Sequence, residues 1–133
     1  MKVTFLGTGT SSGVPLVACQ CHVCTSPDWR DKRLRCSVLL EWDDKKVIID
    51  VGTDFRQQML RENVKQLDAV LITHAHFDHI GGLDELRAFN FVQGKDMPVY
   101  ADVLASNMLS NTFAYVFAEN KYPGTPNLEL HTF

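Results

Sequence analysis

Long apolar runs and a strong excess of charge of one sign are both missing from this sequence. No stretch of about 18 or more apolar residues occurs, so the sequence predicts no helix that spans a membrane. The N-terminal segment MKVTFLGTGTSSG has neither the basic start nor the apolar core of a secretory signal, so we expect a cytoplasmic protein. Thirteen basic and sixteen acidic residues leave a net charge of −3. This balance gives no general electrostatic attraction to membranes and does not favour nucleic acid as a partner.

The composition is that of an ordinary globular chain. With 133 residues, 45% hydrophobic and 22% charged, the chain can bury a moderate core. It contains no internal repeat, low-complexity tract or interdomain linker, so we expect one soluble domain over residues 1–133. One cluster of basic residues could approach a phosphate, although an exposed loop of mixed charge explains it equally well: Arg30, Lys32, Arg33 and Arg35.

Short apolar runs alternate with helical patterns along the chain. Strands are expected at 3–6, 38–42, 47–51, 69–72, 99–100 and 128–131. Helices are expected at 54–62 and 83–90, with a helix or a pair of turns at 105–117. Asp54 is a plausible cap for the first helix, and the uninterrupted apolar run at 69–72 predicts a strand covered on both faces. The whole pattern predicts an α/β fold.

The segment THAHFDHIGG follows the apolar run at 69–72 directly. Four side chains that can bind metal fall within six positions: His74, His76, Asp78 and His79. Gly81 and Gly82 then let the backbone turn tightly into the next helix. A turn of this kind can point all four side chains inward. A surface turn with incidental histidines is the alternative, but it suits a lone histidine better than this spacing.

Imidazole and carboxylate ligands together suit zinc, manganese or iron, and they favour hydrolysis over redox chemistry. Four ligands in so short a span are too many for one catalytic ion that keeps an open position. They therefore predict two neighbouring divalent ions, with zinc and manganese both acceptable. A water that bridges the two ions would be a hydroxide nucleophile near neutral pH.

The HAHFDH run resembles the signature of the metallo-β-lactamase fold superfamily, whose members are hydrolases and related enzymes built as an αβ/βα sandwich. The resemblance implies that His74 and His76 bind one ion, and that Asp78 and His79 bind the other and take part in catalysis. Asp50, in IIDVGTDF, matches an earlier acidic position at a strand end. The resemblance implies that this carboxylate supports the metal loop without binding metal. On the residues alone, Asp50 could instead end its strand or cap the segment after it.

Three of the four cysteines are clustered. Cys19, Cys21 and Cys24 form C-x-C-x-x-C, a spacing that points to metal or redox chemistry in a chain without a signal peptide. Three thiolates could hold one structural zinc ion if a fourth ligand arrives from elsewhere. A redox motif or three unrelated thiols is the alternative. His22 lies inside the cluster but is not expected to bind the same ion, and Cys36 is expected to be a small buried residue.

The N-terminal layout narrows the resemblance to one branch of the superfamily. LGTGTSSGVP, CQCHVC, RCSVLLE and IIDVGTDFR look like the phosphodiesterase branch, which includes the cyclic phosphodiesterase of phosphonate (C-P lyase) metabolism. The resemblance implies a small-molecule phosphodiester substrate and a structural zinc ion on the three cysteines. The pyrroloquinoline quinone biosynthesis B protein has a comparable cysteine cluster, and ribonuclease Z shares the metal signature. A thioester or lactam hydrolase on the same scaffold is a further alternative.

The later metal ligands of the superfamily are missing from this chain. His131 is the only histidine after His79, and its segment LELHTF looks like the strand before those ligands. We therefore expect the N-terminal half of a metallo-β-lactamase αβ/βα sandwich, truncated at its C-terminus. Such a half would expose apolar surface, which predicts a homo-oligomer. Alone, it would be an inactive part of a hydrolase, or a non-catalytic zinc-binding or self-associating half-domain, unless another segment or copy completes it.

Overall fold

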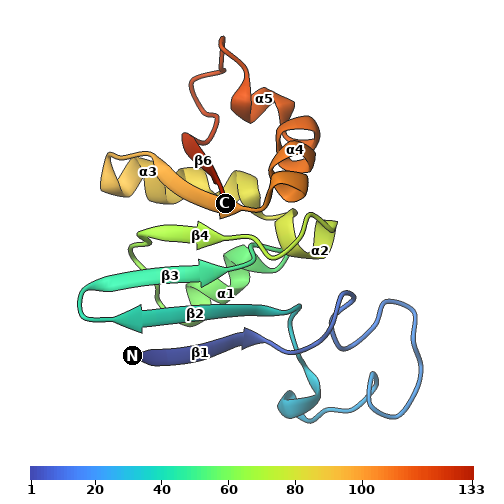
Figure 1. Cartoon of the computed structure of the whole chain (residues 1–133). Coiled ribbons are helices and arrows are strands. Elements are labelled where there is room, and N and C mark those ends of the chain that lie inside the picture. The colour runs from blue at the N-terminus through green and yellow to red at the C-terminus, as the bar shows by residue number, and fades with distance from the viewer.

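The computed structural model describes all 133 residues and contains one six-stranded sheet. The strands lie in chain order across the sheet, from β1 to β6 (Figure 1). The first three pair antiparallel: β1 (Lys2–Gly7), β2 (Ser37–Trp42) and β3 (Lys45–Ile49). The next three run parallel to β3: β4 (Ala69–Leu71), β5 (Met97–Ala101) and β6 (Leu128–Thr132). All six predicted strands are therefore present, and the α/β prediction is confirmed.

Helices connect the parallel strands, as the sequence predicts. They are α1 (Phe55–Arg61), α2 (Phe77–Ile80), η2 (Leu83–Leu86), α3 (Arg87–Gln93), α4 (Val103–Thr112) and α5 (Ala114–Phe117). The short 3-10 turn η1 (Trp29–Asp31) lies between the antiparallel strands β1 and β2. The helix expected at 83–90 begins as a 3-10 turn and becomes α-helical only at Arg87. The pattern at 105–117 is broken at Phe113, whose φ of −111° and ψ of 42° separate α4 from α5. None of these helices has the length and apolar character needed to cross a membrane.

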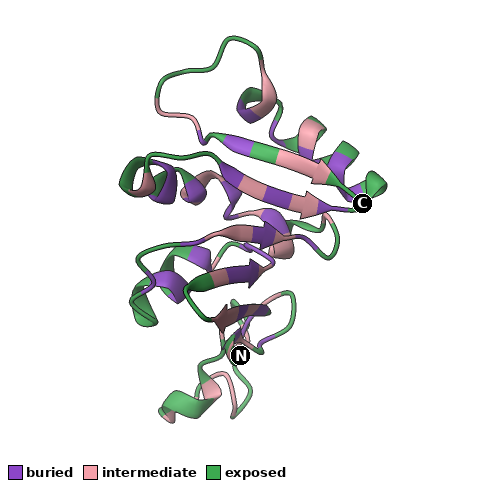
Figure 2. Ribbon diagram, turned by 60° about the vertical axis from the view of Figure 1, so that its left-hand side comes forward, coloured by how far each residue is buried: buried purple, intermediate pink, exposed green.

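Helices cover only one face of the sheet. One row of side chains across β2 to β5 is at most 2% exposed: Leu39, Ile48, Val70 and Val99. The adjacent row, on the opposite face, is only half-buried: Val38, Ile49, Leu71 and Tyr100. Figure 2 shows this alternation along β5. The prediction that the strand at 69–72 is covered on both faces is therefore wrong, because the helices that connect the parallel strands all pack on the same side.

Two further local predictions are wrong. Asp54 precedes α1, but its side chain makes no capping hydrogen bond. It instead accepts hydrogen bonds from the backbone and the guanidinium of Arg35, at 2.8 and 2.9 Å. Cys36 is exposed rather than buried, because it precedes β2 and lies outside the covered face of the sheet.

Candidate metal centre

Asp50 and the histidine segment meet at the carboxyl edge of the parallel strands. Asp50 directly follows β3 and the segment from Thr73 follows β4, and these strands are neighbours. The Asp50 N–H donates to the Leu71 carbonyl at 2.9 Å, which holds the two strand ends together. In open α/β sheets this edge is where ligands usually bind.

The Asp50 carboxylate is buried and accepts three hydrogen bonds. Its side chain receives the Thr73 N–H and the Thr73 hydroxyl at 2.8 Å each, and His79 Nδ1 at 2.7 Å. Asp50 is 5% exposed and adopts a φ of +63°. A residue other than glycine in this region of the backbone is uncommon, and such strain concentrates at functional sites. The structure thus brings Asp50 and His79 together, although they are far apart in the sequence.

These contacts fix the tautomers of two histidines. Because the Thr73 hydroxyl donates to Asp50, its oxygen accepts from Nδ1 of His74 at 3.0 Å. His79 donates from Nδ1 to Asp50 in the same way. In its neutral form each of these imidazoles then carries no hydrogen on Nε2. An imidazole nitrogen in this state is a metal ligand.

The four predicted ligands form two adjoining pairs. His74 Nε2 and His76 Nδ1 are 3.2 Å apart, and His79 Nε2 and an Asp78 oxygen are also 3.2 Å apart. Two ligands of one tetrahedral zinc ion, each about 2.0–2.1 Å from the metal, are roughly 3.3 Å from each other. The pairs adjoin, because the His74 and His79 ring centroids are 4.0 Å apart. The donor set therefore fits divalent metal ions.

Close backbone packing holds the short helix that carries Asp78 and His79. The Val51 N–H donates to the His79 carbonyl, and the Gly82 N–H donates to the Val51 carbonyl, both at 2.8 Å. A Cβ on Gly52 would lie 1.9 Å from the Asp78 carbonyl oxygen, and one on Gly82 would lie 2.3 Å from the Gly52 carbonyl oxygen. Gly82 is therefore needed for close approach rather than for a special turn, since its φ is an ordinary −96°.

The two pairs differ in their access to solvent. His74 and His76 are exposed, whereas the side chains of Asp78 and His79 are 19% and 17% exposed. A cleft of about 140 Å³ lies beside the exposed pair, and α4 contributes part of its wall. The other lining side chains include Asp102, Leu104 and Met108. The centre is thus open to a substrate on the side that faces α4.

No sequence pattern points to Thr73 beyond its place before the histidines, and none points to Leu104 or Met108. A pattern within a short turn identifies His74 to His79, but the meeting of this turn with α4 is a property of the fold. His131 lies elsewhere, as expected. Its ring stacks on Tyr100 with a centroid distance of 4.8 Å, within the sheet.

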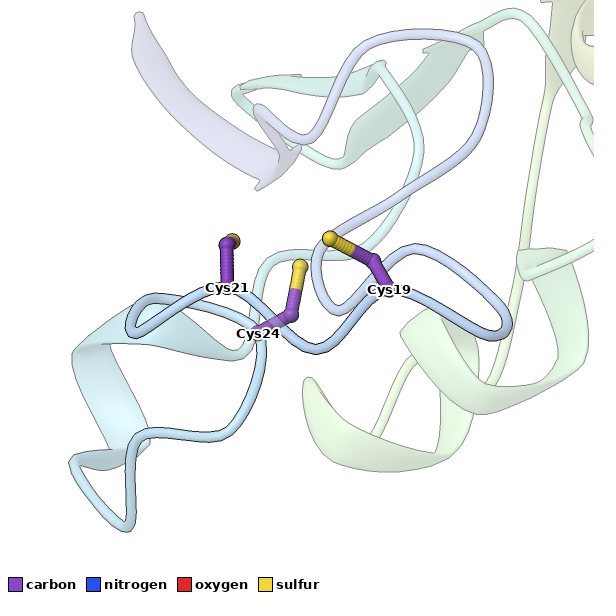
Figure 3. Close-up of side chains that lie close together, drawn as sticks. All are labelled: Cys19, Cys21 and Cys24. Carbon is purple, nitrogen blue, oxygen red and sulfur yellow. The ribbon is translucent and has the colours of Figure 1, made fainter.

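The three clustered cysteines come together in the loop between β1 and β2. Figure 3 shows the side chains of Cys19, Cys21 and Cys24 converging on one side of this loop. Their sulfur atoms all lie within 4.8 Å of one another, whereas tetrahedral zinc thiolates are roughly 3.8 Å apart. Three ligands of one ion therefore need only a small closure of the group. His22 and Cys36 are exposed and lie outside it.

The surroundings shift the pKa values of Cys21 and Cys24 in opposite directions. The backbone N–H of Cys24, and then the neighbouring thiols, lower the pKa of Cys21 to about 7. The Leu16 N–H favours the thiolate of Cys24 at 3.4 Å, but burial and the neighbouring thiols outweigh it and raise the pKa of Cys24. A thiolate is the form that binds metal. Cys21 therefore reaches the thiolate form more readily than Cys24.

Comparison with known proteins places these features in one family. Residues 45–133 match the model of the Beta-lactamase superfamily domain. The octanoyltransferase of Porphyromonas gingivalis is 48% identical over 131 residues, which cover 98% of this chain and 26% of that protein. Coenzyme PQQ synthesis protein B of Methylorubrum extorquens is 30% identical over 90% of this chain and 44% of that protein.

Among solved structures, a diphosphatase from the PhnP family is 42% identical and superposes with a TM-score of 0.88. The match covers 98% of this chain and 49% of that one. This chain therefore spans half or less of the length of the relatives it matches. Since the family model covers more than half of the chain, and since the solved relative has the same arrangement of strands and helices, the chain belongs to the beta-lactamase superfamily and has part of the metallo-β-lactamase fold.

Proposed function

We propose that this chain provides the histidine and aspartate ligands of a dinuclear metal site in a phosphodiesterase. The observation that carries the proposal is the arrangement of two ligand pairs, each 3.2 Å apart, around the buried Asp50 carboxylate. His74 and His76 would hold one ion, and Asp78 and His79 the other. Asp50 would orient His79 directly and His74 through Thr73.

The chemistry of these ligands supports hydrolysis. Divalent ions held here supply Lewis acidity and a nucleophile near neutral pH. The protein's own part is to fix ligand geometry, because buried hydrogen bonds to the outer nitrogens of ligating histidines set tautomer and orientation. Asp78 and His79, which are half-buried, would hold their ion more rigidly than the exposed pair does.

Phosphodiesters are the proposed substrate class. The support is the 42% identity to a solved diphosphatase of the PhnP family and the resemblance of the N-terminal layout to the phosphodiesterase branch. Since the chain spans about half the length of that relative, the remaining ligands would come from another segment or copy. Cys19, Cys21 and Cys24 would hold a structural zinc ion, with a fourth ligand of the same origin.

Metal titration by calorimetry tests the metal centre. The wild-type chain should bind Zn²⁺ or Mn²⁺ at the histidine site, and His76→Ala should lose this binding. Cys24→Ser should lose only the zinc of the thiol group. His22→Ala is the matched control, since His22 is exposed and lies outside both groups, and it should bind as wild type. Identical titrations of wild type and His76→Ala would refute the proposal.

A second candidate function is hydrolysis of an acyl thioester. The observation in its favour is the 48% identity to a protein named octanoyltransferase, of which this chain covers only 26%. That name can belong to the other part of the protein, so we rank this candidate second. The metal centre would be the same, and only the substrate would differ.

Turnover separates the two candidates. The longest gene product that contains this chain should be assayed with bis(p-nitrophenyl) phosphate and with an octanoyl thioester. Phosphodiester turnover that is lost in His76→Ala would support the first candidate. Faster turnover of the thioester, lost in the same variant, would support the second.

A further inference from the structure

The free edge of β1 borders a recess that the metal centre does not use. The recess has a volume of about 590 Å³, within the range of roughly 300–1,000 Å³ that is typical of small-molecule sites. It lies between β1, the loop that carries η1, and α1. Figure 1 shows this loop beside the open edge of the sheet, where β1 pairs only with β2. No residue of the recess belongs to the two metal-binding groups described above.

Two aromatic rings that line the recess are exposed. Trp29, in η1, is 79% exposed, and Phe5, in β1, is 68% exposed. Neither ring packs against another aromatic ring of the chain. Exposed apolar side chains of this size that line one recess are candidates for an interaction site. Because every nucleobase has a π face, exposed aromatic rings are suited to base stacking.

The charged side chains that line the recess, Lys32 and Arg61, are both basic. Lys32 Nζ donates to the Ser26 carbonyl at 2.7 Å, and Arg61 Nη2 donates to the Leu6 carbonyl at 2.8 Å. Arg61 Nε also donates to Glu62, which does not line the recess. The ammonium keeps two of its three donors and the guanidinium three of its five. These contacts restrain the cations and leave donors for an anion.

We propose that this recess binds a nucleotide unit. Its base would stack on Trp29 and Phe5, and Lys32 and Arg61 would hold its phosphate. The side-chain amide of Gln57, which also lines the recess, can pair with the polar edge of a base. An apolar peptide would give Lys32 no charged partner, and inorganic phosphate would leave the rings without a stacking partner. A free nucleotide and one unit of single-stranded RNA share this chemistry. The proposal does not depend on the proposed hydrolase.

Tryptophan fluorescence tests the proposal on the whole chain as purified. The chain has two tryptophans, and Trp42 lies outside the recess, so Trp42→Phe leaves Trp29 as the reporter. AMP should quench this signal with saturation. Adenosine and inorganic phosphate should each bind at least about fivefold more weakly, because each lacks one of the two contacts. Tighter binding of tetra-adenylate than of AMP would identify single-stranded RNA as the source, and equal binding would identify the free nucleotide.

Variants test the named contacts by calorimetry. Trp29→Ala and Lys32→Glu should each weaken AMP binding at least about fivefold. Both side chains are exposed, so the variants should keep the fold, which circular dichroism checks. His76→Ala is the control and should bind AMP as wild type does. Absence of AMP and tetra-adenylate binding in the wild type, or wild-type affinity in Trp29→Ala, would overturn the proposal.

Discussion

At the scale of single residues, one buried carboxylate connects two of the proposed metal ligands. Asp50 contacts His79 directly and reaches His74 through the Thr73 hydroxyl. Its positive φ carries a conformational cost that the surrounding hydrogen bonds offset. Asp50 therefore controls the orientation of side chains that lie far along the sequence from it.

Replacing Asp50 with Asn should lower the affinity of the histidine site for Zn²⁺ by about 10–100-fold. The amide has one oxygen, so it cannot accept from Thr73 and His79 as the carboxylate does. Calorimetric titration measures the change. Asp44→Asn, in the exposed turn between β2 and β3, is the matched control and should leave the affinity unchanged. Equal affinities in both variants would mean that Asp50 does not orient the histidines.

Replacing Gly52 with Ala should destabilise the fold by about 1–3 kcal/mol. The added Cβ would lie 1.9 Å from the Asp78 carbonyl oxygen, so α2 would have to move away from the sheet. Urea denaturation measures the loss. Gly124→Ala, whose Cβ would approach only the exposed ring of Tyr122 at 3.2 Å, should stay within about 0.5 kcal/mol of wild type. A neutral Gly52→Ala would contradict the close packing of α2.

The residues of the candidate metal centre differ in how well sequence alone predicts them. His74, His76, Asp78 and His79 lie in one short turn, so their spacing is enough to group them. Leu104 and Met108 join the same cleft from α4, and nothing local to that helix indicates this. The exposure of Cys36 also could not be predicted from the residues near it, because it depends on where β2 begins.

At the scale of elements, periodicity locates the helices but not their interruptions. The sequence predicts a helix or a pair of turns at 105–117, but no glycine or proline between Val103 and Phe117 marks where the break between α4 and α5 falls. The break occurs at Phe113, which is 7% exposed, and Val116 is fully buried. Both side chains are buried by packing in the core, and helix propensities do not predict this packing. The strand at 69–72 shows the same limit, because an apolar run does not say how many faces are covered.

Tyr115 in the short helix α5 donates a hydrogen bond to Asp84 in η2, and this contact predicts that stability depends on pH. Burial, and then the hydrogen bond to Asp84 at 2.8 Å, raise the pKa of Tyr115 from 10.0 to about 12. Because the folded state holds this proton more tightly, the contribution to stability is complete below pH 10.0 and is lost as the pH rises through about 12.

Absorbance titration of the three tyrosines should therefore show one that ionises near pH 12. Tyr115→Phe should remove this step, and Asp84→Asn should move it to lower pH. Tyr122→Phe is the control, since Tyr122 is 80% exposed, and it should leave the late step in place. A late step that survives in Tyr115→Phe would contradict the assignment.

At the scale of the whole molecule, the sheet has one covered and one open face. The open face carries a half-buried apolar row that includes Val38, Ile49 and Leu71. The open face could be predicted from the sequence only through the family resemblance, because the periodicity of apolar residues does not show which elements pack together. We expect the isolated chain to associate through this face.

Leu71→Lys should reduce this association and change the free energy of unfolding by only about 1 kcal/mol. Val70→Lys, on the neighbouring residue, should cost several kcal/mol, because it places a charge in the covered face. Sedimentation velocity measures association, and urea denaturation measures stability. Equal association of wild type and Leu71→Lys would exclude the open face as the contact.

The sequential order of the six strands has a consequence for biosynthesis. Each strand from β2 onward pairs with the strand made just before it, so no strand must wait for a later one to find its place. The pairing of β2 with β3 closes a short turn and forms fast, whereas the other pairings close longer connections. A nascent chain can therefore build this sheet progressively as it leaves the ribosome. Asp50 and the histidines would meet once β4 has paired, before β5 and β6 have left the ribosome.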